Sequence, residues 1–405
     1  MPSSMIVSQA ATLLNAVVQQ QTGQATLANI ANNADFVSVA QTALLTGRDP
    51  VLNALSQVWG RTIFAQREYN QPLASLYMTP DRYGNALRKI TLEAKPMVDD
   101  QAFKWPVAYD AGQTPPLGDG QSVDMYRISK NRALQLNFFG SASYAQHWTI
   151  FEREFDVAFS DAEEFVLWNS AIVTERRNDR ERYEEGKARL LQLNYIASIL
   201  DENASDRVIH LLSEYNTLTG ATPAFTAQTI MQPGVFEAFI RWMYSRIRTI
   251  VGLMRESSNM FQTNITGYNI LHHTNPENIR IALYRPFMEM IRSMVLSITY
   301  NNDMLTLPTY EAIDFWQAID TPDSINTTPT YTDTSGAAHT AGSAVTSSTV
   351  IGLIHDRDAL GYSICDERSN VTPYNADGDY WNHFVKFRVR AIQDMCEKGV
   401  VLCLD

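Results

Sequence analysis

The sequence is poor in residues that build covalent frameworks and metal centres. Its three cysteines, Cys365, Cys396 and Cys403, all lie in the last tenth of the chain. An odd number at these spacings argues against a disulfide framework and a zinc site, so we expect small buried side chains in a reducing compartment. The one adjacent histidine pair, His272 and His273, would point to opposite faces of a strand and could not easily share a metal. We therefore expect no metal and no cofactor.

Long apolar runs and a basic N-terminus are also missing. No apolar stretch approaches the roughly 18 residues that span a bilayer, and Asp35 is the only charged residue before Arg48. These absences predict a chain without a targeting signal and without membrane contact. The start of the chain is rich in Ala, Gln, Asn and Thr. We interpret residues 1–60 as an N-terminal arm packed on the body or on a neighbouring copy, or as a terminal helix on the same subunit.

Positive charge is scarce. The 32 Lys and Arg residues face 44 Asp and Glu, which gives a formal net charge of −12. Binding to nucleic acid through phosphates alone requires clustered cations that displace counterions. The balance therefore argues against a broad DNA-gripping surface. It also means that like copies repel each other, so any assembly must overcome this repulsion through apolar and polar contacts.

Catalytic and cofactor motifs are absent as well. Gly186-Lys187 lacks the upstream glycine of a phosphate-binding loop, and Gly118-x-Gly120 lacks the third glycine of a dinucleotide fingerprint. Neither a G-x-S-x-G elbow nor an H-E-x-x-H motif occurs. We expect a protein that is not an enzyme, although a site built from dispersed residues stays open at this point.

Residues 88–145 alternate apolar and polar side chains but are interrupted by Pro, Gly and Asp. Ile90 and Leu92 begin one leg, Gly118-Asp119-Gly120 is a turn signal, and alternation returns from Leu134 to Phe138. This pattern predicts a long hairpin with too little apolar surface for a core of its own. An extended hairpin of this kind must lie against something else, which favours assembly over catalysis.

Residues 160–200 read as one long helix with a charged middle. Between Glu175 and Arg189, 11 of 15 residues are charged, and opposite charges at i,i+4 support the helix. These pairs are Arg177–Glu181, Arg180–Glu184 and Glu185–Arg189. The charges suit either a solvated helix face or a rod that faces equivalent rods in adjacent subunits.

The rest of the chain is mixed. We predict a helix over 235–255, a buried strand over 268–272 and an amphipathic helix over 277–297 kinked at Pro286. Thr, Ser, Ala and Gly dominate 320–349, which predicts an exposed loop or a sparse two-stranded flap. Two apolar segments, 380–395 and 400–404, suit a closing pair of antiparallel strands.

Three aromatic residues are candidate anchors for contacts between subunits, because aromatics are enriched at interface hot spots. They are Trp105 and Tyr109 in the hairpin and Trp148 after it. The alternative for each is packing within its own chain. The charged helix adds four candidate contact residues: Arg177, Arg180, Glu181 and Glu184.

The order of these elements resembles the major capsid proteins of tailed bacteriophages, which have the HK97-like fold. Local similarity lies in the helix entry FSDAEEFV at 159–166, in Asp356-Arg357-Asp358 and in GDYWNHF at 378–384. The resemblance implies an α+β fold with an N-terminal arm, an extended loop, a peripheral domain carrying a long spine helix, and an axial domain. The implied bounds are 61–84 for the start of the peripheral domain, 85–150 for the extended loop, 151–214 for the peripheral domain with the spine helix, 215–350 for the axial domain and 351–405 for the strands that complete the body.

The resemblance also implies a function and partners. The chain would self-assemble as pentamers and hexamers into an icosahedral head shell that encloses double-stranded DNA without sequence-specific binding. A scaffolding protein and a portal would be further partners, with a decoration protein possible, and the finished protein would reside in the virion after assembly in the host cytoplasm. Two alternatives stay open from sequence: an encapsulin-type nanocompartment shell, and a soluble hydrolase with a dispersed site.

Overall fold

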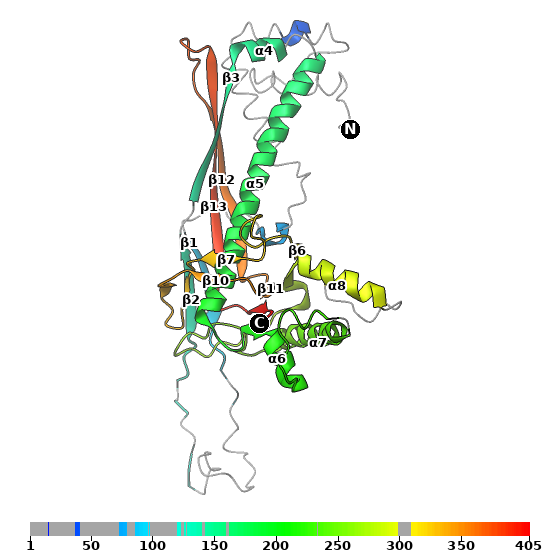
Figure 1. Cartoon of the computed structure of the whole chain (residues 1–405). Helices are drawn as coiled ribbons and strands as arrows, with labels where there is room; N and C mark the ends of the chain where they lie inside the picture. Colours follow the sequence, from blue (N-terminus) through cyan, green and yellow to red (C-terminus); the bar gives the residue numbers. More distant parts are fainter. Residues whose placement is uncertain are drawn as a thin grey trace.

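The computed structural model describes residues 15, 37–40, 73–78, 86–95, 97, 120–122, 125–126, 128–139, 142–158, 162–232, 234–298 and 309–405. This part of the chain is elongated, with a long helix running obliquely along it and a body of strands and further helices at one end (Figure 1). The predicted helix at 160–200, the hairpin and the predicted helix at 235–255 can all be located in it. Most of the N-terminal arm, Trp105, Tyr109 and the hairpin tip at 118–119 lie outside the described residues.

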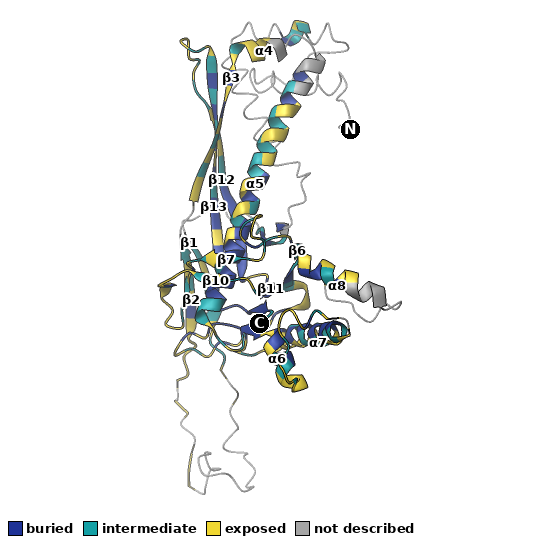
Figure 2. Cartoon of the chain, viewed as in Figure 1, coloured by how far each residue is buried: buried dark blue, intermediate teal, exposed yellow. Residues whose placement is uncertain are grey.

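The long helix is α5 (Ala162–Glu202), with 41 residues. Two of the three predicted ion pairs span successive turns: Arg180 Nε lies 2.7 Å from Glu184, and Arg189 lies 2.7 Å from Glu185. Its last third changes character, because side chains such as Leu193, Ile196 and Ile199 are buried in the core. The helix is therefore mostly exposed or half-buried where it runs along the elongated part and buried where it enters the body (Figure 2).

A three-stranded antiparallel sheet lies alongside α5, in the order β12 (Leu360–Val371), β13 (Tyr380–Gln393) and β3 (Ala142–Phe151). The register pairs β3 with β13 without a shift over its whole length. The short helix α4 (Glu152–Ala158) follows β3, and the 3-10 turn η1 (Ala74–Leu76) leads to Tyr77, which bridges to Tyr362 at the start of β12.

A five-stranded sheet forms the centre of the body. Its order is β4 (Val208–His210), β14 (Gly399–Cys403), β11 (Val350–Asp356), β5 (Ile279–Tyr284) and β6 (Glu311–Ile313). Alternate side chains of β14 belong to different cores: Val401 packs with the end of α5, whereas Val400 and Leu402 pack with the helices opposite. Both faces of the sheet are covered, which explains why its central strands are nearly continuous apolar runs.

Three helices supply the second core: α6 (Leu211–Thr219), α7 (Val235–Arg255) and α8 (Arg285–Ile298). The buried stripe of α7 repeats at helical spacing and ends at Met254, as the sequence predicts. Two arginines of α7 pair with carboxylates. Arg246 donates two hydrogen bonds to Glu214, and Arg241 donates one to Glu237.

The predicted helix over 277–297 is wrong in its first half. Residues 279–284 form β5, and η2 (Pro276–Asn278) is a single 3-10 turn before it. Pro286 then lies in the first turn of α8, where the missing N–H costs no helical hydrogen bond, and it does not kink the helix. The apolar run of β5 suits burial on both sheet faces as well as it suits a helix, and periodicity alone did not separate the two.

Two further strand predictions are also wrong. Residues 268–272 contribute one isolated bridge, from His272 to Ser258, and Leu271 is exposed. The closing pair does not form, because β13 joins the three-stranded sheet and β14 joins the five-stranded one. Gly399 begins β14 where a Cβ atom would lie 2.1 Å from the Tyr195 hydroxyl, so close packing on α5 fixes the place of that strand.

The Thr- and Ser-rich region folds as small ladders. Strand β7 (Ile325–Thr327) pairs with β10 (Val345–Ser347), and β8 (Thr330–Thr332) pairs with β9 (Ala338–Thr340). The Asn194 side chain on α5 bonds both backbone groups of Thr330, and Tyr331 donates a hydrogen bond of 2.9 Å to Asp201. Polar contacts thus hold this sparse flap on the end of α5.

Candidate assembly surfaces

The hairpin legs predicted from alternation pair as β1 (Ala86–Leu92) and β2 (Ala133–Phe139), with Ala86 opposite Phe139 and Leu92 opposite Ala133. Because side chains alternate along a strand, the hairpin has two faces of different character. One face packs on the body of its own subunit, and the other points away from it.

A buried ion-pair cluster fixes the inner face. Lys89 donates a hydrogen bond of 2.6 Å to Asp394 and a second, short one to Glu397. The Asp394 side chain is 1% exposed, and Glu397 also lies 3.4 Å from the His272 ring. Burial acts to lower the pKa of Lys89, but the two carboxylates outweigh it and hold that pKa above its usual value. Lys89 therefore stays charged and ties the hairpin to the segment between β13 and β14.

Apolar and backbone contacts extend this attachment. Leu134 and Leu136 of β2 pack against Ile265 and Ile270 of the body. Just beyond the strands, the Ala94 N–H donates a hydrogen bond of 2.8 Å to the Asn269 carbonyl, and the Arg132 guanidinium lies 4.7 Å from the centre of the Tyr268 ring. The base of the hairpin is therefore part of the body.

The opposite face of the hairpin is exposed and mixed in character, because Ile90 and Leu92 of β1 lie beside Arg88 and opposite polar side chains such as Gln135 of β2. Ile90 is 60% exposed and Leu92 is 64% exposed. Further along the same arm, large side chains are even more open to solvent: Met97, Met125, Tyr126 and Ile128. Single exposed apolar residues are ordinary, whereas several large ones on one projecting element make it a candidate contact surface.

The candidate contact residues of α5, and Trp148 of β3, lie mainly between the helix and the three-stranded sheet of their own subunit. Trp148 is buried, with its ring stacked 5.4 Å from His383 and the Arg176 guanidinium 5.1 Å from its centre. Glu181 and Glu184 are each 7% exposed. Within one subunit these side chains help to seat α5 on the sheet, and their contact with a neighbour stays a prediction, as does that of Arg177.

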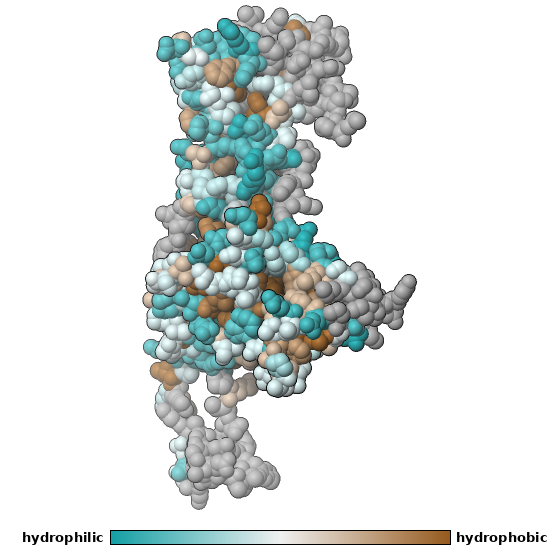
Figure 3. Space-filling view, viewed as in Figure 1, coloured by the Kyte–Doolittle hydropathy of each residue, from teal (hydrophilic) through white to brown (hydrophobic). Residues whose placement is uncertain are grey.

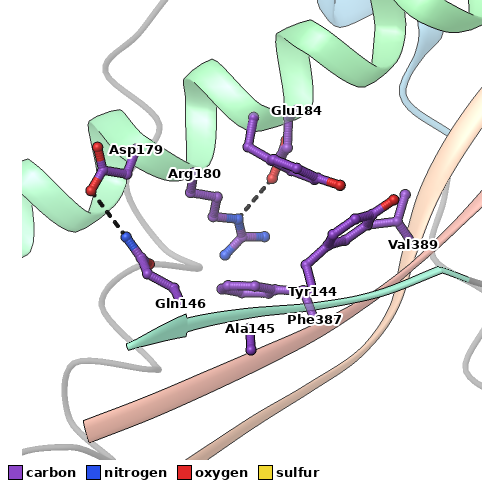
Figure 4. A pocket seen from close by; sticks show the side chains of 9 residues that line it. Tyr144, Ala145, Gln146, Asp179, Arg180, Glu184, Phe387 and Val389 are labelled. Carbon is purple, nitrogen blue, oxygen red and sulfur yellow. Dashed lines mark hydrogen bonds and ion pairs between the residues drawn. The ribbon is translucent and has the colours of Figure 1, made fainter. Parts of the chain in front are cut away.

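Arg180 lies at a cavity of about 280 Å³ between α5 and the strands β3 and β13. Its guanidinium lies 4.7 Å from the centre of the Phe387 ring, and the other walls include Tyr144, Tyr183 and Val389 (Figure 4). On the face seen in Figure 3, hydrophilic side chains cover much of the α5 region and apolar atoms form scattered patches. The cavity is thus a local apolar feature in a polar part of the subunit.

Sequence reasoning missed the residues that anchor the hairpin. Lys89 carries a usable signal, because it falls between Leu87 and Thr91 on the inward face of the alternation, where a cation needs a buried partner. Asp394 and Glu397 carry none, since they lie about 300 residues away and only the fold brings them to Lys89.

The described residues form neither a metal centre nor a membrane-spanning helix. Across the described ranges, no three His, Cys, Asp or Glu side chains group closely enough to hold a metal ion. Among the helices that the structure describes, none combines the length and the apolar character needed to cross a membrane.

Replacing Lys89 by methionine should loosen the hairpin and lower the free energy of unfolding by about 3 kcal/mol, because two carboxylates lose their buried partner. Hydrogen exchange of β1 and β2, together with urea unfolding, measures both effects. Lys95→Met is the matched control on the same arm, since Lys95 is exposed and donates a hydrogen bond of 2.9 Å to the Ser129 hydroxyl. Equal unfolding of the two variants would show that the cluster does not hold the hairpin.

The fully buried His383 should make the subunit sensitive to acid. Burial lowers its pKa to about 4 from an ordinary 6.5. Between pH 6.5 and 4 the unfolded chain therefore binds a proton at His383 that the folded chain does not bind. The free energy of unfolding should fall by about 3 kcal/mol as the pH decreases through this range, whereas above pH 6.5 nothing is lost. His383→Phe keeps an aromatic ring on Trp148 and should lose this part of the pH slope in thermal unfolding. Part of the slope should persist through His355, whose pKa burial also lowers to about 4.

Comparison with known proteins assigns this α+β subunit to the proteins that build viral shells. The sequence model of the Phi29-like phage major capsid protein family matches residues 14–391. The chain therefore belongs to the Phi29-like phage major capsid protein family, and it is a structural protein of the phage head shell. The predicted α+β class is confirmed, and the family membership favours the head shell over the nanocompartment and hydrolase alternatives.

Solved capsid structures are similar to the chain at low sequence identity. The capsid of Staphylococcus phage Andhra aligns with a TM-score of 0.49 and 9% identity over 84% of this chain and 86% of that one. The capsid of the cyanophage P-SCSP1u aligns with a TM-score of 0.42 and 9% identity over 84% of this chain and 89% of that one. No curated protein matches the chain significantly.

Proposed function

We propose that copies of this chain assemble as pentamers and hexamers into an icosahedral shell, and that the hairpin β1–β2 of each copy lies on an adjacent copy. The observation that carries the proposal is the pair of exposed apolar side chains on the outer face of the hairpin, Ile90 and Leu92, on an arm whose inner face is fixed by Lys89. An arm that is fixed at its base and exposes large apolar side chains on its free face gains stability by covering them against a neighbour.

The energetics suit reversible assembly. Covering the rest of Ile90 and Leu92 gives roughly 2 to 3 kcal/mol per contact, which is weak for one pair of subunits. A closed ring or shell repeats the contact around every copy, so the total becomes large while single errors can still dissociate. The net charge of −12 opposes association and keeps free subunits soluble.

The parts of the chain take roles in this scheme. Residues 85–150 act as the extended loop, α5 as the spine of a peripheral domain at 151–214, and 215–350 as an axial domain near the capsomer axis. Residues 1–60 act as the arm, 61–84 as the start of the peripheral domain, and 351–405 as the strands that complete the body. The chain works as a structural subunit without a catalytic role.

The shell encloses double-stranded DNA, and an acidic inner surface would let that DNA slide during filling. A separate scaffolding protein, a portal and a decoration protein are further partners of the proposal, with assembly in the host cytoplasm and the virion as final location. Acidic residues gathered on the outer face of an assembled shell would contradict the DNA part of the scheme.

Electron microscopy and light scattering of the purified protein, alone and with a candidate scaffold, test the proposal. We expect closed shells or five- and six-fold rings, with density for a hairpin over each neighbouring copy. A protein that stays monomeric with scaffold present would overturn self-assembly. Rings in which the hairpins touch no neighbour would overturn the role of the arm while leaving the shell function intact.

A further inference from the structure

Glu367 of β12 is a carboxylate buried between α5 and the three-stranded sheet. It pairs across the sheet with Phe387 of β13, which in turn pairs with Tyr144 of β3, so the three side chains form one row on the face that α5 covers. The Glu367 side chain is 10% exposed. Neither of its carboxylate oxygens accepts a hydrogen bond from the described part of the chain. A buried carboxylate in this state is costly when charged.

The guanidinium of Arg180 lies close to two carboxylates, those of Glu184 and Glu367. Arg180 Nη1 lies 3.6 Å from Glu367, beyond hydrogen-bonding distance, while Arg180 Nε donates a hydrogen bond of 2.7 Å to Glu184. Burial raises the pKa of Glu367 to about 7, Arg180 opposes this rise and Glu184 adds to it. The nearest charges on β12 itself, Asp366 and Arg368, pair with each other at 3.0 Å.

Among the described residues, Arg180 is the one cation that acts on the charge of Glu367. From β13 and β3 the row presents the rings of Phe387 and Tyr144. Tyr183 of α5 packs on Tyr144 with ring centres 4.2 Å apart, and the Lys187 ammonium lies over these two rings, 5.1 Å and 5.4 Å from their centres. Lys187 is therefore engaged with the tyrosines, and the charges that act on Glu367 are those of Arg180 and Glu184 on α5.

The space beside this cluster allows α5 to move. The walls of the cavity of about 280 Å³ include Arg180, Glu184 and Phe387, and Glu367 lies behind these side chains rather than in the wall itself. It is large enough to admit several water molecules, each of which occupies about 30 Å³ in the liquid. Gly186 lies on the exposed side of α5 one turn further on, and glycine within a helix weakens it locally. A poorly paired carboxylate, a cavity and a weak helical turn thus coincide.

We propose that a proton on Glu367 controls how α5 is seated on the three-stranded sheet. The neutral acid lies under Arg180 with the helix closed on the sheet. When Glu367 loses this proton to solvent, its carboxylate draws water from the adjoining cavity past Arg180 and Glu184, and the turns of α5 that carry these two residues loosen from β12 and β13. Because α5 runs along the subunit, its seating changes the shape that a subunit offers to its neighbours (Figure 1).

Hydrogen exchange of the unassembled full-length protein at about pH 6 and about pH 8, corrected for the intrinsic pH dependence of exchange, tests the proposal. A group that titrates near 7 is ionised about tenfold more at the higher pH, so exchange of residues 175–190 should rise about tenfold. Glu367→Gln, a neutral side chain of the same shape, should abolish this rise. Asp366→Asn is the matched control on the exposed side of β12 and should behave as wild type.

A second measurement separates the switch from a general loss of stability. The folded state keeps its proton up to about pH 7 and the unfolded state loses it near 4.5, so this part of the stability is present below 4.5 and is lost between 4.5 and 7. The thermal midpoint of Glu367→Gln should therefore rise relative to that of wild type as the pH increases from 4.5 to 7. Above pH 7 the difference between the two midpoints should stay constant. Equal pH profiles for the two proteins, or a rise in exchange that persists in Glu367→Gln, would overturn the proposal.

Discussion

Replacing Arg207 by methionine should lower the free energy of unfolding by about 4 kcal/mol, because the side chain is fully buried and its removal leaves a carboxylate without its partner. Arg207 Nη1 bonds Glu202 at 2.5 Å and the Thr263 hydroxyl at 2.7 Å, and Nε donates to the Gly399 carbonyl at 3.2 Å. One side chain thus connects the end of α5, the loop after α7 and the start of β14. Urea unfolding followed by circular dichroism measures the loss.

Two further variants define what the Arg207 result means. Arg207→Met combined with Glu202→Gln removes both charges and should recover part of the lost stability, because no buried carboxylate remains. Arg182→Met removes an arginine that is 72% exposed and pairs with Asp179 at 2.7 Å, so it should change the stability by less than about 0.5 kcal/mol. If Arg207→Met unfolded at the same urea concentration as Arg182→Met, the buried network would carry no stability.

The elements with regular signals could be predicted from the sequence. Opposite charges at i,i+4 outlined α5, an apolar stripe gave α7, and alternation gave the legs of the hairpin. The strand β5 was mistaken for helix because a strand buried on both faces loses its alternation. The prediction of a closing strand pair is wrong for a different reason. The strands β13 and β14 are neighbours in the chain but belong to different sheets, and their apolar residues do not indicate which strand each one pairs with.

The sequence also indicates some features of the candidate contact surface and not others. Ile90 and Leu92 stand out in the sequence as an apolar row on a hairpin leg, and the structure leaves them exposed. Trp148 and Glu184 also drew attention by residue type, but their burial comes from the sheet against α5, which is assembled from strands more than 200 residues apart in the chain. Glu367 gave no signal, since a glutamate in a polar strand segment is ordinary until its neighbours are known.

Replacing Ile90 and Leu92 together by threonine should prevent shell formation at the concentration at which the wild type assembles, while leaving the subunit folded. Both side chains are already exposed on the hairpin, so the free energy of unfolding should change by less than about 1 kcal/mol, and threonine retains the preference for strand structure. Each contact with a neighbour loses roughly 2 kcal/mol, about a 30-fold drop in its association constant. Because every copy repeats the contact, we expect the critical concentration for assembly to rise at least 30-fold, measured by light scattering and electron microscopy.

The matched variant Ile90→Val with Leu92→Met keeps the face apolar and should assemble close to the wild-type concentration. It separates lost apolar contact from any disturbance of the strand, since both double variants alter the same two positions. Shells formed by the threonine variant at the wild-type concentration would show that the outer face of the hairpin lies free in the shell. Lys89→Met offers the complementary case, because there the face is intact and its attachment is weakened. If assembly needs both the apolar face and a rigid base, Lys89→Met should also raise the critical concentration, and the shells that form should show weaker density for the hairpin.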